Sequence, residues 1–211
     1  KTGLGKPSIP FLAFGTKFID LNLDGWLDVF VANGHVIDNI NLINKQYQHA
    51  QYNQIYMNQG NATFLDKTIE INGDIMQKSV SRGAAFGDID NDGDSDFIIS
   101  NNNEPAALFI NISESSNNWV GFELQGIDCN RDAIGSKLIF TTDSGVQVAW
   151  VNPASSYLTS NDKRVVFGMG NEERILSLEI EWAGSNKQLF TDIKPNFYYK
   201  IIQGELPLIV R

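Results

Sequence analysis

Two short acidic stretches carry the residues best suited to chemistry. Residues 20–28 read Asp-Leu-Asn-Leu-Asp-Gly-Trp-Leu-Asp, and residues 88–96 read Asp-Ile-Asp-Asn-Asp-Gly-Asp-Ser-Asp. Carboxylates crowded into one loop repel one another and resist burial, so a bound cation is expected to neutralise them. Calcium suits the pattern, because it takes six to eight oxygen ligands and alternate residues of a curled loop can supply them.

The alternation predicts two Ca²⁺ sites and their ligands. Side-chain oxygens are expected from the first, third, fifth and ninth positions, and a backbone carbonyl from the seventh. The predicted ligands are Asp20, Asn22, Asp24, Trp26 and Asp28 in the first loop and Asp88, Asp90, Asp92, Asp94 and Asp96 in the second. The alternative is an acidic, solvated turn that holds no metal. Asx-turns, however, account for only one or two Asp residues per loop.

The residues that follow the loops exclude the most familiar motif with this spacing, the EF-hand. An EF-hand loop lies between helices and ends in a bidentate Glu at its twelfth position. Here the twelfth positions are Val31 and Ile99, inside runs rich in β-branched and aromatic residues. Each loop is therefore predicted to lead into a β-strand.

The two loops belong to an internal repeat. An offset of 68 residues aligns residues 18–33 with residues 86–101. Residues 55–58 resemble residues 108–111 at a shorter offset, so the first copy carries about 15 extra residues between positions 34 and 54. Three or four short strands repeated in this way are typical of β-propeller blades.

The insertion at 34–54 is rich in Asn and Gln with interleaved Tyr and His, a composition that suits a recognition loop or an ordinary solvated surface. His35 and His49 have no partner at a catalytic spacing and are interpreted as structural.

The composition of the chain changes near residue 117, and no acidic loop follows that position. Partial alternation predicts strands at 119–125, 136–142, 146–151, 164–168, 175–182 and 197–202, with hairpin turns at 142–145 and 183–186. We therefore predict an all-β chain with two domains. A partial propeller of two calcium-loop blades spans 1–116, and a small β-sandwich or barrel spans 117–211.

Three side chains of the second domain are assigned to structure. Trp150 and Trp182 lie in alternating strands and are expected in the core. Arg131 is expected to pair with Asp132 or Asp162 and so to tie two loops together; this structural role is favoured over binding a ligand.

Composition excludes several partners. The chain has 25 acidic and 16 basic residues, for a net charge of −9, and no basic patch, so a nucleic acid would be repelled. Its longest apolar runs have the length of a strand, which predicts no membrane span. Cys129 is the single cysteine, so an internal disulfide cannot form and cysteine usage does not indicate the redox compartment.

The motifs also carry a family resemblance. Residues 18–33 and 86–101 resemble FG-GAP (VCBS-type) propeller repeats, whereas residues 130–135, 155–162, 166–170 and 180–182 resemble the ASPIC/UnbV domain. That order is similar to the C-terminal part of the cartilage acidic protein family and its bacterial relatives. The resemblance implies a secreted or cell-envelope protein whose propeller binds partners, with no agreed enzymatic chemistry. A closed propeller needs four or more blades, so the remaining blades are expected upstream in a longer parent chain.

The predicted function is a calcium-binding, non-enzymatic binding or cell-adhesion module for a protein or glycan partner, in an extracellular or periplasmic setting. No catalytic residue and no cofactor other than Ca²⁺ is predicted. The alternative is a carbohydrate-active enzyme, such as a glycoside hydrolase or a lyase. A glycosidase needs two opposed carboxyls, at least one of them free of metal, and no such pair is recognisable in the sequence.

Overall fold

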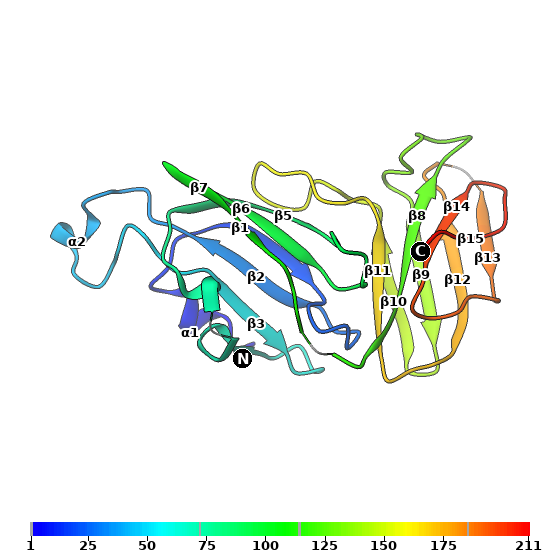
Figure 1. Cartoon of the computed structure of the whole chain (residues 1–211), viewed down its shortest axis with the longest axis horizontal. Coiled ribbons are helices and arrows are strands. Elements are labelled where there is room, and N and C mark those ends of the chain that lie inside the picture. Colours follow the sequence, from blue (N-terminus) through cyan, green and yellow to red (C-terminus); the bar gives the residue numbers. More distant parts are fainter. Residues whose placement is uncertain (1, 72, 114, 185) are drawn as a thin grey trace.

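The computed structural model describes residues 2–71, 73–113, 115–184 and 186–211, and it shows two all-β regions side by side along one long axis (Figure 1). We call strands β1 to β7 the blade region and strands β8 to β15 the sandwich. The strands of the blade region are β1 (Ala13–Ile19), β2 (Asp28–Asn33), β3 (Gln54–Asn58), β4 (Phe64–Asp66), β5 (Ser81–Gly87), β6 (Asp96–Asn101) and β7 (Glu104–Phe109). Its short helices are α1 (Gly5–Ser8), α2 (Ile40–Ile43), α3 (Thr68–Ile71) and η1 (Gly73–Met76).

The blade region holds two antiparallel sheets, one with the order β1-β2-β3-β4 and one with the order β5-β6-β7. Their registers repeat. Lys17 pairs with Phe30 in the first sheet, and Ala85 pairs with Ile98 in the second, each 68 residues further on. Both hairpins carry an irregularity at the same place, between Ala13 and Thr16 and between Ser81 and Ala84. The predicted blade repeat is thus confirmed at the level of strand pairing.

The two blades pack face to face through a shared apolar core. Phe30 and Ile55 of the first blade are buried against Phe86, Phe97 and Ile99 of the second. Burial of such side chains contributes about 1.5–3 kcal/mol each, so this layer holds the blades together.

Each blade has a second face that points away from the shared core, and these two faces differ in how they are covered. Val29, Val31 and Tyr56 of the first blade lie beneath Leu4 and Phe64. In the second blade, Ile98 and Leu108 occupy the positions equivalent to Phe30 and Ile55, yet they are 46% and 56% exposed. The surface that the first blade buries is therefore open in the second.

The inserted residues lie where the repeat predicted them. The first blade joins β2 to β3 through residues 34–53, which include α2 and project away from the sandwich (Figure 1). The second blade joins β6 to β7 through residues 102–103 alone. In the described part of the chain, no helix has the length and apolar character that a membrane crossing requires.

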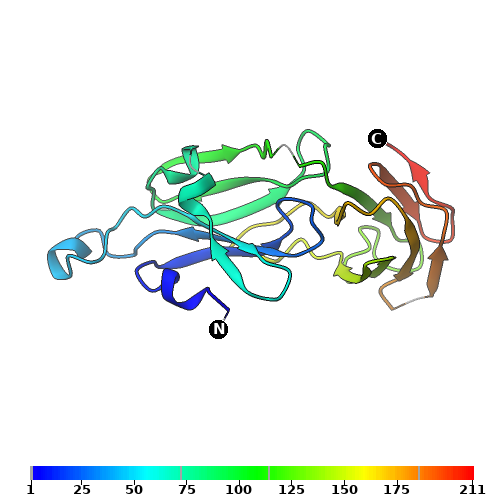
Figure 2. The same ribbon diagram turned by 90° about the horizontal axis from the view of Figure 1, so that it is seen from below.

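The second region is a β-sandwich and not a barrel. Its strands are β8 (Asn118–Gln125), β9 (Lys137–Thr142), β10 (Gly145–Trp150), β11 (Val165–Gly170), β12 (Ile175–Glu181), β13 (Lys187–Phe190), β14 (Tyr198–Ile202) and β15 (Leu208–Ile209). One sheet has the order β10-β9-β12-β13 and the other β11-β8-β14-β15, with β14 parallel to β8. Figure 2 shows this region, with the C-terminus, at one end of the molecule.

The sandwich core confirms the alternation read from the sequence. Phe122 and Phe167 of one sheet face Phe140 and Leu178 of the other, and all four are buried. The six predicted strands are present, whereas β13 and β15 were missed because they are short edge strands with mostly exposed side chains. Residues 183–186 were predicted to turn the hairpin between β12 and β13; residue 185 lies outside the described residues.

Two structural assignments were wrong. Trp182 is buried as expected, but Trp150 is 55% exposed, because β10 is an edge strand and the Trp150 side chain lies on the uncovered face. The expected Arg131 pair is replaced by two others: Lys163 Nζ lies 2.8 Å from Asp132 Oδ1, and Arg164 pairs with Asp162 at 2.6 Å. Lys163, and not Arg131, therefore ties the two loops together, whereas the Arg164 pair lies within one segment.

Candidate metal centre

The second acidic loop, residues 88–96, connects β5 to β6 and is folded by its own carboxylates. Asp88 accepts hydrogen bonds from the backbone N–H groups of Asn91 (2.6 Å) and Gly93 (2.8 Å). Asp96 accepts from Ile89 N (2.7 Å) and from Asn111 N (2.8 Å), and so joins the loop to the end of β7. Negative side chains at the first and ninth positions therefore curl the chain so that its oxygens converge.

The first loop, residues 20–28, repeats this scheme. Asp20 accepts from Asp24 N (3.1 Å) and Gly25 N (2.8 Å), whereas Asp28 accepts from Leu21 N (3.0 Å) and Asn58 N (2.8 Å). The two loops also share left-handed backbone positions, at Leu23 and Gly25 in the first loop and Asn91 and Gly93 in the second. Glycine adopts this conformation without strain, which explains its place in both sequences.

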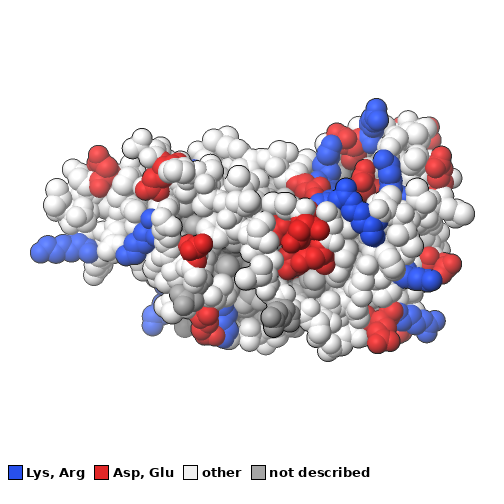
Figure 3. Space-filling model, viewed as in Figure 1, with Lys and Arg blue, Asp and Glu red and all other residues white. Residues whose placement is uncertain are grey.

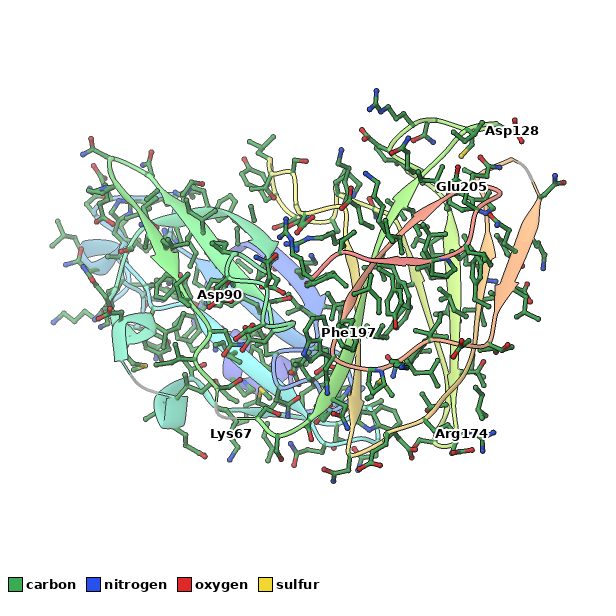
Figure 4. The ribbon with its side chains drawn as sticks, turned by 45° about the vertical axis from the view of Figure 1, so that its right-hand side comes forward. Lys67, Asp90, Asp128, Arg174, Phe197 and Glu205 are labelled. Atoms are coloured by element: carbon green, nitrogen blue, oxygen red, sulfur yellow. The ribbon has the colours of Figure 1, made fainter. Side chains whose placement is uncertain are left out.

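The carboxylates of the second loop come close enough to share one ion. Asp88, Asp90 and Asp96 each offer an oxygen, and these three atoms lie within 4.8 Å of one another. Asp94 is buried as well, and its Oδ1 has no hydrogen-bond partner. Asp92 lies on the exposed side and accepts a hydrogen bond from Asp94 N (3.1 Å). Figure 4 shows Asp90 and Phe197 at the junction between the blade region and the sandwich.

The donor set fits a hard divalent cation. Its donors are oxygens, a carboxylate that accepts two hydrogen bonds keeps lone pairs for a metal, and a buried oxygen without a partner is costly unless a ligand satisfies it. Burial raises the pKa of Asp94 to about 8, with further contributions from the neighbouring carboxylates. Burial likewise raises the pKa of Asp20 to about 7 and that of Asp28 to about 6. A bound cation would reverse these shifts by favouring the ionised forms.

Some polar groups of the first loop have hydrogen-bond partners within the loop and do not depend on a metal. Asn22 Nδ2 donates to Asp24 Oδ2 at 3.0 Å, and Asn22 Oδ1 accepts from Asp24 N at 3.3 Å. Where the second loop has a further carboxylate at Asp90, the first loop has a neutral amide that donates a hydrogen bond to the neighbouring Asp24.

The sandwich lies against the second loop and binds it directly. Tyr198 Oη donates to Asp88 Oδ2 at 2.6 Å in a buried hydrogen bond. The Arg164 guanidinium donates to Asn91 Oδ1 (2.8 Å) and to the backbone carbonyl of Asp88, and it lies 4.6 Å from the centre of the Tyr198 ring. A Cβ atom on Gly93 would overlap the Trp119 ring. The second loop is thus packed between its blade and the sandwich.

The first loop meets the sandwich through a backbone hydrogen bond and through Leu23, whose side chain is buried with Trp119 and Tyr198. Gly170 N donates to Leu23 O at 2.9 Å, and a side chain on Gly168 would overlap Asp20 and Leu23. Figure 3 shows acidic side chains gathered near the middle of the molecule, where the two regions meet, with basic side chains beside them.

The structure therefore gathers three of the predicted second-loop ligands and places Asp94 differently from the prediction. Asp94 was expected to contribute only its backbone carbonyl, and its buried carboxylate was not anticipated. Tyr198 and Arg164 were also missed. They lie 110 and 76 positions from Asp88, and their residue types carry no local signal of a contact with the loop.

Comparison with known families agrees with the two regions. Residues 20–99 match the FG-GAP-like repeat family, and residues 126–207 match the family described as ASPIC and UnbV. The chain thus carries the two in the order that the sequence motifs indicated. FG-GAP repeats are typical of extracellular proteins, and this combination fits an extracellular, non-enzymatic module. No curated protein matches the chain.

Proposed function

We propose that this chain, in which FG-GAP-like repeats precede an ASPIC and UnbV domain, is a calcium-binding, non-enzymatic binding module of an extracellular or cell-envelope protein. The second loop carries the proposal. Oxygens of Asp88, Asp90 and Asp96 lie within 4.8 Å of one another, beside a buried Asp94 oxygen that has no partner. Calcium would supply the positive charge that this loop lacks.

The role proposed for calcium is structural. Each loop leads directly into a central or inner strand of its blade, β2 in the first and β6 in the second. Fixing the loop fixes the start of that strand and, through Asp28 and Asp96, the end of the next strand. The ion would therefore hold in place a rigid surface that recognises a protein or glycan partner.

Calorimetric titration of the metal-free chain with Ca²⁺ tests the proposal. We expect two binding events, and Asp88→Asn should abolish or strongly weaken one of them. Asp143→Asn is the matched control, because Asp143 lies in the exposed β9–β10 turn outside both loops. An absence of binding at millimolar Ca²⁺, or an equal effect of the control, would contradict a calcium-binding function.

Melting the chain with and without chelator gives a second readout. A free ion concentration of 100 times Kd stabilises the folded state by about 2.7 kcal/mol, because the ion binds only that state. Chelation should therefore lower the melting temperature markedly. A melt that does not respond to chelator would count against a structural ion.

The enzymatic alternative gains no support from the site. A glycosidase needs one carboxyl that stays protonated and is free of metal. The carboxyls that burial holds protonated near neutral pH, Asp20 and Asp94, belong to the two loops and are proposed metal ligands. The binding module is the reading that uses these residues consistently.

A further inference from the structure

A cleft separates the blade region from the sandwich and holds the features of a ligand site. Its volume is about 430 Å³, and ligand sites commonly fall between about 300 and 1,000 Å³. Strands β1 and β5 line one side of it, and β10, with the residues that follow it, lines the other. The lining also includes three carboxylates: Asp20 and Asp88, which are proposed calcium ligands, and Asp162, which pairs with Arg164. Two sheets of different origin thus contribute side chains to one concave surface.

Lys17 of β1 contributes an ammonium group to this cleft, where it lies over the Phe86 ring and is attracted at longer range by Asp162. Among the described residues, its Nζ has no hydrogen bond and no ion pair; it lies 5.1 Å from the centre of the Phe86 ring. Burial lowers the pKa of Lys17 to about 8, although Asp162 counteracts part of the shift. A desolvated ammonium that lacks acceptors is unfavourable unless a ligand supplies them.

The internal repeat shows that the blade itself does not require this lysine. The equivalent residue of the second blade, 68 positions later, is Ala85, which holds the same register in its hairpin. The hairpin register therefore does not require a lysine at this position; besides its contact with the Phe86 ring, the Lys17 charge is available for a role in the cleft.

The cleft also exposes aromatic surface. Trp150 of β10 is 55% exposed and Phe18 of β1 is 58% exposed, although the repeat equivalent of Phe18, Phe86, is buried in the core between the blades. Aromatic rings combined with a few polar groups are the usual lining of a small-molecule site. Here they stand on opposite walls of one cleft.

Two neutral side chains add free donors at the β10 wall. Asn152 Oδ1 accepts from Ala154 N at 3.0 Å, and Ser155 Oγ accepts from Asn161 Nδ2 at 3.0 Å. These bonds use acceptor atoms only, so the Asn152 amide N–H groups and the Ser155 hydroxyl proton remain to bind a ligand's oxygens.

We propose that this cleft binds a uronic acid residue of an acidic glycan, with the sugar carboxylate on Lys17, the apolar ring face on Trp150 and the hydroxyls on Asn152 and Ser155. The inference rests on the proposed function, since it names the ligand class of the same binding module. Of the two lysines that line the cleft, Lys163 pairs with Asp132, so the ammonium of Lys17 is left to match one negative charge. A phosphate would call for a fork of Arg donors, and the cleft's Arg164 is already engaged by Asp162 and by the second loop.

Calorimetric titration of the calcium-loaded chain with trigalacturonate tests the proposal, with galactotriose as the neutral comparison. Loss of a hydrogen bond to a charged group weakens binding by about 10- to 100-fold, and we expect this for Lys17→Met. Trp150→Ala should weaken binding by about tenfold. Lys67→Met is the control: Lys67 pairs with Glu70 and does not line the cleft, so it should leave the affinity unchanged. Lys17→Ala reproduces the residue of the second blade and guards against a folding artefact.

The proposal is overturned if trigalacturonate shows no saturable binding below about 10 mM, if galactotriose binds equally well, or if Lys67→Met is as damaging as Lys17→Met. Binding of a peptide carboxylate in preference to the sugar would overturn it too. A calcium titration of the same sample separates the two proposals. Calcium binding without uronate binding defeats only the glycan site, whereas uronate binding without calcium binding defeats only the metal sites.

Discussion

The two repeats of the blade region share one backbone and differ in what surrounds it. The hydrogen bonds that Asp20 and Asp28 accept from the backbone recur at Asp88 and Asp96, each 68 residues later. The first blade is covered on both faces, and its loop meets the sandwich through a backbone hydrogen bond and the apolar side chain of Leu23, which packs with Trp119 and Tyr198. The second blade leaves one face open, whereas its loop accepts hydrogen bonds from the side chains of Tyr198 and Arg164. The repeat thus sets conformation, and the neighbours decide stability and affinity.

Substitutions on the faces of the two blades are expected to differ most in their effect on the free energy of unfolding. Ile55 and Leu108 are equivalent residues, buried and exposed respectively. Ile55→Ala should lower the free energy of unfolding by about 2–5 kcal/mol because it leaves a cavity. Leu108→Ala should change it by no more than about 0.5 kcal/mol, as is usual at the surface. Urea unfolding of both variants measures the contrast; equal losses would mean that the face of the second blade is covered in solution.

The sandwich contact gives the next largest effect. Tyr198→Phe removes the buried donor to Asp88 and should weaken calcium binding at the second loop by about tenfold, as loss of a hydrogen bond to a metal ligand generally does. The first loop should keep its affinity. Tyr199→Phe is the control, because the Tyr199 hydroxyl bonds to Lys194 and touches neither loop. An equal loss at both loops in a calcium titration would show that the sandwich does not act selectively.

The loop sequences predict a smaller difference. The second loop offers four side-chain carboxylates from the predicted positions and the first offers three, because Asn22 stands where the second loop has Asp90. Ligand charge is one determinant of calcium affinity, so Asn22→Asp should tighten the first site by about three- to tenfold. Calorimetry beside the unchanged chain measures this effect. A first site that is unchanged or weaker would defeat the argument from charge.

The pH dependence of stability gives the most diagnostic effect. Burial raises the pKa of Asp20 to about 7 and of Asp94 to about 8, above the value of about 3.9 for an unfolded Asp. The folded, metal-free chain then holds protons that the unfolded chain has lost, so its stability should fall as pH rises from about 4 to about 8. Saturating calcium should remove this fall, because the bound ligands are already ionised. Urea midpoints at several pH values, with and without calcium, check the sign; a metal-free chain that gains stability with pH would contradict it.

Much of the fold followed from local pattern. Turn residues and acidic spacing located both loops, and alternation located six strands of the sandwich. The change of offset located the insertion between β2 and β3. These features depend on neighbours within a few residues, which the sequence displays directly. Trp150 was misplaced because alternation distinguishes two faces of a strand but does not say which face another sheet will cover.

By itself, therefore, the sequence determined the repeat, the curled loops and the residues that can supply oxygens to an ion. Only the tertiary structure decided that Tyr198 and Arg164 hold the second loop, that the Asp94 carboxylate is buried there, and that Lys17 and Trp150 line one cleft. Those contacts join residues far apart in the chain, where no periodicity links them. They arise from the way two finished sheets dock, and docking depends on shape and charge that exist only after each sheet has formed.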